Sequence, residues 1–491
     1  MQRTAVKPLV LVIFVLALSV RLFNLNLPFL EPFNNYSRQS MSASVARNFY
    51  DHGFNLFYPE IYENGNGPSL YNVEMPLYSY LMALGYQLAG GVHEWVARLV
   101  SVLFSMGFLI FLYLFVRHTA DEATACWALV FAALSPMMVA LSRSVQPDIT
   151  MLFTGTAALY FFYLYHETGK ISAYALSAAS LFLAVLTRPF ALYFLLPIIF
   201  LAWKREGFYF LRNGRHYLYA GFVLSALCWY FYMWKMGKDL DLAYQPYHYS
   251  SATDHFKILD YFLPQNLALP AKALFLHLLT PIGAFLGCLG IMKKGKAQRF
   301  FLVWLIATMI YLLLLWKTAV VHPYYFLPLS PPLAFFVGCG AERIRKDSGF
   351  WNKLKRPAVM LATSIFLIIN LFYYYRLLYF VPDDRMAVVE AGKAMDSMIP
   401  KGALVVAAYH TSPIQLYYCH HRGWTFDLTE GDQESRVARL EALRKKGAEF
   451  FVTTELGAIA SQPVLKDYLS RYPLKKIEDR FEIWRLNGEG S

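Results

Sequence analysis

Acidic and basic side chains stand at the ends of apolar segments in this 491-residue sequence. Glu74 comes just before one apolar run, and Asp148 stands at the junction of two others. A carboxylate in such a place can accept a proton from an attacking group, while a neighbouring cation stabilises charge on a leaving phosphate. These residue types together indicate one site for transfer from a phosphate-linked donor.

Asp148 follows Pro147, and both residues suit the first turn of a helix. Capping of that helix alone would explain the aspartate, just as a solvated loop position would explain Glu74. An ionisable group at membrane depth is nevertheless a candidate for function. Arg143 is placed to pair with Asp148 or to bind an anion. We therefore take Glu74 and Asp148 as the catalytic candidates.

Cations and tyrosines at two further junctions are candidates for substrate binding. Arg188 interrupts an apolar region, where it either snorkels to the interface or holds a phosphate with its planar fork of donors. Lys317 precedes His322, Tyr324 and Tyr325 at the other junction. These groups suit a phosphate and a sugar, although interfacial anchoring by Tyr and Lys is an equal alternative.

The residue types allow a metal but do not require one. Carboxylates suit Mg or Mn, so a divalent ion bridging Glu74 and Asp148 is one option. The five cysteines include no C-x-x-C pair and lie mostly in or beside apolar runs. They predict neither a disulfide framework nor a zinc site.

The composition points to the lipid bilayer. Hydrophobic residues make up 57% of the chain and charged residues only 16%, with a mean hydropathy of +0.36. Soluble globular proteins have about 25% charged residues. The net charge of +12 does not indicate a nucleic-acid partner, because the basic residues cluster at the ends of apolar spans and no nucleic-acid-binding motif is present.

Apolar spans of suitable length predict about eleven membrane helices. We place them at 8–28, 96–116, 122–142, 148–166, 171–187, 188–203, 217–235, 273–292, 300–316, 323–341 and 357–379. We interpret the first span as a retained signal anchor. Lys and Arg are richer in one set of connections, which predicts a cytoplasmic N-terminus and an extracytoplasmic C-terminus in the cytoplasmic (inner) membrane. The polar clusters then all lie on the outer face.

Two further regions stand out from the spans. The connection 31–95 is long and rich in aromatic residues, so we interpret it as a folded cap that carries the site. Residues 1–382 form the predicted membrane domain, and residues 383–491 read as a soluble α/β domain outside the membrane. Its expected strands and helix are 403–409, 435–446, 449–454 and 482–486.

Several short motifs, in their order among the spans, resemble the GT-C membrane glycosyltransferases. The resemblance is to the branch with protein O-mannosyltransferases and the lipid A aminoarabinose transferase, and it runs through most of residues 1–380. The motifs are Arg38-Gln39, Ala46-Arg47-Asn48-Phe49, Tyr58-Pro59, Glu74-Met75-Pro76-Leu77-Tyr78, His93-Glu94 with Arg98, Arg143 with Pro147-Asp148, Thr187-Arg188-Pro189 and His322-Pro323-Tyr324-Tyr325 with Leu327-Pro328.

This resemblance implies a GT-C-like polytopic helical enzyme that takes a sugar from a polyprenyl-phosphate carrier and passes it to a lipid, glycan or protein acceptor. Glu74 matches the loop glutamate before proline, and Asp148 matches the acid after the third span. Arg188 stands where the family commonly has a basic phosphate contact. The candidate substrate-binding residues are Arg38, Arg47, Tyr58, Arg143, Arg188, Lys317, His322, Tyr324 and Tyr325. The sequence departs from the family near Met41, where relatives often carry an aspartate soon after Arg-Gln.

Two other classes of function fit parts of the sequence. A transporter or flippase for a lipid-linked sugar would place polar residues at the membrane midplane, whereas here they gather at one interface. A catalytically inactive GT-C-like scaffold would keep the fold without the first-loop acid. In the enzyme, Glu31, Glu74 or Asp148 would have to supply the base.

Overall fold

The apolar segments of the chain form α-helices in the described residues, as expected where backbone hydrogen bonds must be satisfied within the segment. The computed structural model describes residues 2–71, 74–240, 263–292, 294–347, 372–477 and 479–487, with residues 349, 353 and 357. The chain divides into two units. The first comprises Met1–Leu25, Arg98–Tyr232 and Tyr247–Tyr375, and the second comprises Asn26–Ala97, Met233–Pro246 and Arg376–Ser491.

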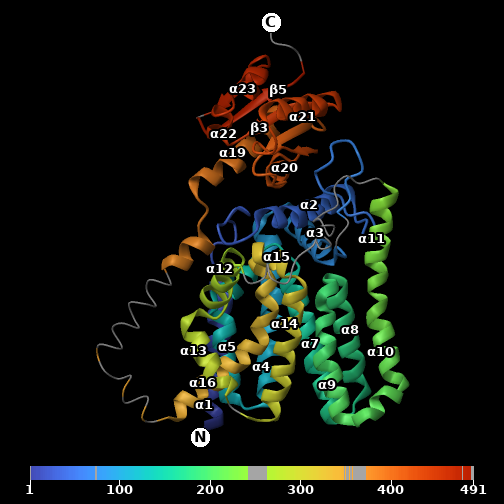
Figure 1. Cartoon of the computed structure of the whole chain (residues 1–491), viewed down its shortest axis with the longest axis vertical. Helices are drawn as coiled ribbons and strands as arrows, with labels where there is room; N and C mark the ends of the chain where they lie inside the picture. Colours follow the sequence, from blue (N-terminus) through green and yellow to red (C-terminus); the bar gives the residue numbers. More distant parts are fainter. Residues whose placement is uncertain are drawn as a thin grey trace. The chain divides into compact units, whose positions relative to one another are not determined.

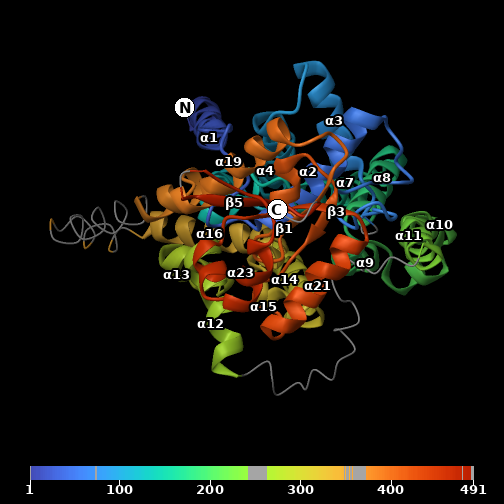
Figure 2. The same ribbon diagram turned by 90° about the horizontal axis from the view of Figure 1, so that it is seen from above.

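Helices make up the described part of the first unit. They are α1 (Gln2–Leu22), α4 (Glu94–Thr119), α5 (Glu122–Leu134), α6 (Pro136–Leu141), α7 (Asp148–Thr168), α8 (Ile171–Thr187), η1 (Pro189–Phe194), α9 (Leu195–Glu206), η2 (Gly207–Arg212), α10 (Gly214–Ser225), α11 (Leu227–Asp239), α12 (Pro264–Lys272), η5 (Ala273–Leu278), α13 (Thr280–Ile291), α14 (Lys296–Leu314), α15 (Trp316–Val321), η6 (Pro323–Leu329) and α16 (Ser330–Lys346). Helices α4 and α11 extend into the second unit. Helices α7, α8 and α9 are neighbours in both Figure 1 and Figure 2.

Among the described residues, α4 and α14 are each long and apolar enough to cross a membrane. A third candidate is the pair Leu267–Leu278 and Thr280–Ile291, which is bent by 86°. Two or three of the eleven expected spans therefore meet the criteria of length and composition. Breaks divide several others: the span expected at 122–142 separates into α5 and α6 before Pro136. Most of the span expected at 357–379 lies outside the described residues.

The second unit combines the first-loop helices with an α/β region. Its helices are α2 (Tyr36–His52), α3 (Leu77–Ala89), α19 (Asp383–Met398), α20 (Ile414–Cys419), α21 (Gln433–Lys445), α22 (Leu456–Ala460) and α23 (Pro463–Ser470). Its strands are β1 (Leu404–Ala408), β2 (Gly423–Thr425), β3 (Ala448–Thr453), β4 (Leu474–Ile477) and β5 (Phe481–Arg485). They form one sheet in the order β2-β1-β3-β5-β4.

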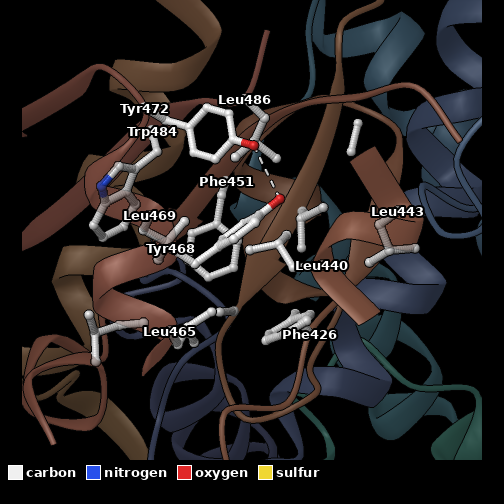
Figure 3. Packing of buried hydrophobic residues seen from close by; sticks show 14 of the residues in the cluster. Phe426, Leu440, Leu443, Phe451, Leu465, Tyr468, Leu469, Tyr472, Trp484 and Leu486 are labelled. Carbon is white, nitrogen blue, oxygen red and sulfur yellow. Dashed lines mark hydrogen bonds between the residues drawn. The ribbon is translucent and has the colours of Figure 1, made fainter. Parts of the chain in front are cut away.

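Strands β2, β1 and β3 run parallel, and β5 pairs antiparallel with both β3 and β4. On one face of this sheet, Phe451 packs between α21 and α23, with Leu440 and Leu465 from those helices (Figure 3). The hydroxyl groups of Tyr468 and Tyr472 are 3.2 Å apart and hydrogen-bonded within this cluster. A buried apolar face on the sheet gives the second unit its own core.

Candidate functional site

Arg38 and Glu74 form a buried ion pair in the second unit. Helix α2 begins at Tyr36 because the side chain of Asn35 accepts a hydrogen bond of 2.9 Å from the backbone N–H of Arg38. The Arg38 side chain therefore projects from the first turn, where its Nη2 pairs with Oε1 of Glu74. Its guanidinium also lies 5.3 Å from the centre of the Tyr71 ring. The two side chains are only 1% and 6% exposed, so the pair is shielded from water.

A second pair joins Asp148 to Arg188 in the first unit. Asp148 begins α7 directly after Pro147, as the sequence predicts. Arg188 ends α8 in an extended conformation (φ −150°, ψ 119°), which the following Pro189 favours. Nη2 of Arg188 lies 2.8 Å from Oδ2 of Asp148, and their side chains are 12% and 11% exposed. The arginine and aspartate expected to share a site are thus in contact.

Aromatic rings accompany the Asp148–Arg188 pair. Tyr311 on α14 lies near both charged residues, and its ring lies 6.5 Å from that of Tyr325. The ring of Tyr325 lies 4.8 Å from that of Tyr324, which stacks at 5.3 Å on the imidazole of His322. The predicted tyrosines therefore belong to one aromatic group with the acid and the cation. The sequence reasoning missed Tyr311, because a tyrosine within an apolar span gives no signal of its own.

The other predicted cation at this junction, Lys317, lies on the short helix α15 and is exposed. Arg143, by contrast, is buried and donates to the carbonyl oxygens that end α1. Its Nη1 lies 3.0 Å from the oxygen of Arg21 and its Nη2 lies 3.1 Å from that of Asn24. These contacts give Arg143 a structural role at the end of a helix, where cations are favoured.

Arg47, expected to bind substrate, contacts α20 in the second unit. Its Nη1 donates a 2.9 Å hydrogen bond to the carbonyl oxygen of Tyr417, and its guanidinium lies 4.3 Å from the centre of that tyrosine's ring. Burial raises the pKa of the Tyr417 hydroxyl to about 12, although the charge of Arg47 opposes the shift. Arg47 thereby fastens α2 to the α/β region. Tyr58 is half-buried in the same loop.

The first loop also continues the C-terminal sheet. The backbone N–H of Gly423 in β2 donates to Tyr62 at 2.9 Å, and its carbonyl accepts from Gly65 at 2.8 Å. Gly65 has φ +54°, and a Cβ there would lie 2.0 Å from the Trp424 ring, so glycine is required twice over. Arg422 adds a 2.6 Å hydrogen bond to the carbonyl of Gly67. The loop therefore pairs with the edge of β2 as an added strand would.

One polar contact beside this edge was not predicted from the sequence. Nε2 of His420 lies 3.0 Å from Oδ2 of Asp51. This contact joins the last turn of α2 to the residue that follows α20. Asp51 and His420 are far apart in the chain, and neither belongs to a motif that marks it as a partner. Only the fold brings them together.

The described residues include no group of three His, Cys, Asp or Glu side chains that could hold a metal ion. Glu74 and Asp148 belong to different units, and each carboxylate is paired with an arginine. A metal bridging Glu74 and Asp148, which the sequence allows but does not require, stays a prediction. We assign no step to a metal.

Comparison with known proteins gives a match over part of the sequence. Residues 73–234 match the family of dolichyl-phosphate-mannose-protein mannosyltransferases. This stretch is less than half of the chain, and it contains Glu74, Asp148 and Arg188. An uncharacterized protein of Aquifex aeolicus is 29% identical over 207 residues, which is 41% of this chain and 45% of that protein. The match thus spans less than half of that relative's length.

Solved structures match almost the whole chain in fold. ArnT from Cupriavidus metallidurans, bound to undecaprenyl phosphate, gives a TM-score of 0.67 at 14% identity over 97% of this chain and 98% of its own. The oligosaccharyltransferase AglB from Archaeoglobus fulgidus, in complex with an inhibitory peptide and a dolichol-phosphate, gives 0.55 at 13% identity over 96% and 73%. These matches confirm the resemblance predicted from the motifs: the chain has the fold of the GT-C superfamily of membrane glycosyltransferases.

Proposed function

We propose that this chain is an integral membrane glycosyltransferase that moves a sugar from a polyprenyl-phosphate-linked donor to a lipid, glycan or protein acceptor. One observation carries the proposal. The stretch that matches the mannosyltransferase family contains both acids of the two shielded carboxylate–arginine pairs, Glu74 with Arg38 and Asp148 with Arg188. The undecaprenyl phosphate and dolichol-phosphate named for the solved relatives support a lipid-phosphate donor.

Each pair supplies the two kinds of group that such a transfer needs. A carboxylate accepts the proton of the acceptor nucleophile as the new bond to the sugar forms, and the bond from the sugar to the phosphate oxygen breaks. The leaving polyprenyl phosphate takes the bonding electrons, and an arginine stabilises its charge with two parallel donors. Attack from the face opposite the phosphate makes this an inverting transfer.

The proposal includes the arrangement in the membrane. The N-terminus lies in the cytoplasm, residues 1–382 form the domain of about eleven spans in the inner membrane, and residues 383–491 lie outside. Transfer then takes place at the outer face of the cytoplasmic membrane. Reporter fusions after residue 346 and at the C-terminus test this arrangement, because it predicts opposite sides for the two.

Transfer of labelled sugar from a panel of polyprenyl-phosphate sugars, with purified protein in detergent, tests the activity. We expect turnover in the wild type and its loss in Glu74→Gln. Glu60→Gln is the matched control, because Glu60 is a half-buried carboxylate of the same loop. Equal turnover in the Glu74→Gln protein would remove Glu74 from the site.

A non-catalytic scaffold is the second candidate, and Met41 is the observation that favours it. In the place where relatives often carry the loop aspartate, this residue is 4% exposed and packs in an apolar cluster with Val45 and Phe49. That position of α2 is therefore part of the core. Protein that binds polyprenyl phosphate but transfers no sugar from the whole donor panel would support the scaffold and contradict the enzyme.

A further inference from the structure

The carboxyl ends of β1 and β3 form a topological switch point in the second unit. These strands are parallel neighbours, with Ala408 paired to Thr453 at their ends. The chain leaves β1 through α20 toward β2 on one side, and it leaves β3 through α22 and α23 toward β4 and β5 on the other. In open α/β sheets, ligands bind outside the carboxyl ends of strands at such a point.

Polar side chains gather at this point. His410, two residues after β1, places Nδ1 at 2.7 Å from Oε1 of Glu455, two residues after β3. The backbone N–H of His410 donates to the other carboxylate oxygen at 3.3 Å. The His410 side chain is 60% exposed, whereas that of Glu455 is 15% exposed. The glutamate thus orients an imidazole that solvent, or a ligand, can reach.

The backbone after β1 adopts a conformation that is costly to maintain. His410 and Thr411 have φ of +44° and +55°, in the left-handed region. This region is uncommon for residues other than glycine and is a marked departure for β-branched threonine. Such strain clusters at ligand-binding and active sites. Here it presents the imidazole and the Thr411 hydroxyl at the surface.

Aromatic rings complete the cluster. The rings of Tyr36 on α2 and Tyr409 after β1 lie 5.8 Å apart, and the guanidinium of Arg385 lies 5.6 Å from the centre of the Tyr36 ring. Burial raises the pKa of the Tyr36 hydroxyl. The charge of Arg385 lowers this pKa and the charge of Glu455 raises it, because both groups lie near the hydroxyl. A 2.8 Å hydrogen bond between Ser37 and Ser412 fastens α2 to this loop.

We propose that the His410–Glu455 cluster binds a saccharide, namely the glycan portion of the acceptor. A carboxylate and an imidazole offer directed hydrogen bonds to sugar hydroxyls. The half-buried ring of Tyr36 offers a flat surface for the apolar face of a pyranose, and the buried Tyr409 ring supports it from below. The cluster contacts the first turn of α2, which also carries Arg38 of the ion pair. The assignment to the acceptor rests on the proposed glycosyltransferase function, whereas saccharide binding itself does not.

Saturation-transfer NMR with a panel of methyl hexosides tests binding on the full-length protein in detergent. We expect saturation to pass from the protein to at least one hexoside, and we expect this NMR signal to fall at least fivefold in Glu455→Gln. Glu449→Gln is the matched control, because Glu449 lies at the opposite end of β3 and accepts from Asn487 at 3.2 Å. His410→Asn is a second variant, since asparagine tolerates the left-handed conformation. Absence of an NMR saturation signal for every hexoside with the wild-type protein would overturn the proposal.

Kinetics separate this proposal from the proposed function. We expect Glu455→Gln to raise the KM for the glycan acceptor roughly tenfold, as expected for a lost hydrogen bond to a charged group, and to leave the KM for the donor unchanged. A raised donor KM instead would overturn the assignment to the acceptor. Absence of turnover in the wild type would refute the transferase, while the NMR experiment would still decide whether the cluster binds saccharides.

Discussion

The Arg38–Glu74 pair allows a structural effect to be separated from a chemical one. Glu74→Gln keeps the shape of the side chain but leaves the Arg38 guanidinium, 1% exposed, without its charged partner. Removing one member of a buried ion pair costs about 3–5 kcal/mol, because the remaining charge stays in a medium of low dielectric constant. The variant should therefore lose stability as well as activity.

The expected size of the effect is measurable. In a domain of 150–250 residues, each 1 kcal/mol shifts Tm by about 2–4 °C, so Glu74→Gln should lower Tm by roughly 6–20 °C. Thermal unfolding in detergent, followed by tryptophan fluorescence, measures this shift. Asp467→Asn is the matched control: it removes the exposed pair with Arg471, whose side chains are 65% and 73% exposed, and such pairs contribute at most about 1 kcal/mol.

A double variant completes the experiment. Replacing both partners, in Arg38→Met with Glu74→Leu, removes both buried charges and should restore Tm to within a few degrees of the wild type. Transfer activity should remain absent, because the proposed base is missing. A Tm for Glu74→Gln no lower than that for Asp467→Asn would refute the reasoning. Activity in the double variant would show that Glu74 has only a structural role.

Three further predictions follow from other contacts. Asp148→Asn should reduce transfer at least a hundredfold, measured as kcat with labelled donor, because it removes the charge that holds Arg188 in place. Gly65→Val should release the first loop from β2, because any Cβ meets Trp424, and hydrogen exchange at residues 62–67 should rise at least tenfold. The hydrogen bond from Arg444 holds the pKa of Glu441 at about 2, so its stabilisation is complete above pH 4.5 and is lost as the pH falls toward 2.

Each of these has a control in the same chain. Asp121→Asn changes another aspartate, which caps α5 by accepting a hydrogen bond from the backbone N–H of Thr124, and should leave kcat unchanged. Gly457→Val should leave hydrogen exchange at 62–67 as in the wild type, because no other atoms surround a Cβ there. Glu441→Gln should have a flatter dependence of Tm on pH between 4.5 and 2 than the wild type. Identical curves would contradict the assigned role of Glu441.

The sequence predicts local structure well where the pattern is self-contained. The helix expected at 171–187 is α8 with the same bounds, and α7 begins at Asp148 after its proline. The strands expected at 403–409 and 449–454 are β1 and β3, each displaced by at most one residue at either end. Periodicity, caps and apolar runs determine these elements without help from distant residues.

Elements that depend on a partner were missed. Strand β2 has only three residues, Gly423–Thr425, which are too few to show an alternating pattern. Its pairing with β1 and with the first loop defines it as a strand. The same is true of charges. Glu74 was named from the sequence, but its pairing with Arg38 was not, because 36 residues separate them and spacing alone indicates no contact.

The tertiary contacts of the candidate residues could not be read from their motifs. The motif that contains Arg47 suggested substrate binding, whereas the side chain stacks on Tyr417 and binds its carbonyl. No motif suggested chemistry in the C-terminal region. His410 and Glu455 meet only because parallel strands end at the same edge of the sheet. Motif matching finds residue types, and the order of strands decides which of them become neighbours.

The pairing of the first loop with β2 joins two segments that are synthesised at different times. Arg422 is made 355 residues after Gly67, its hydrogen-bond partner. At about 5–20 residues per second, the ribosome needs roughly 20 to 70 s to deliver it. During that interval the nascent first loop has no β2 edge with which to pair. The hydrogen bond between Arg422 and Gly67 therefore forms only after Arg422 has been translated.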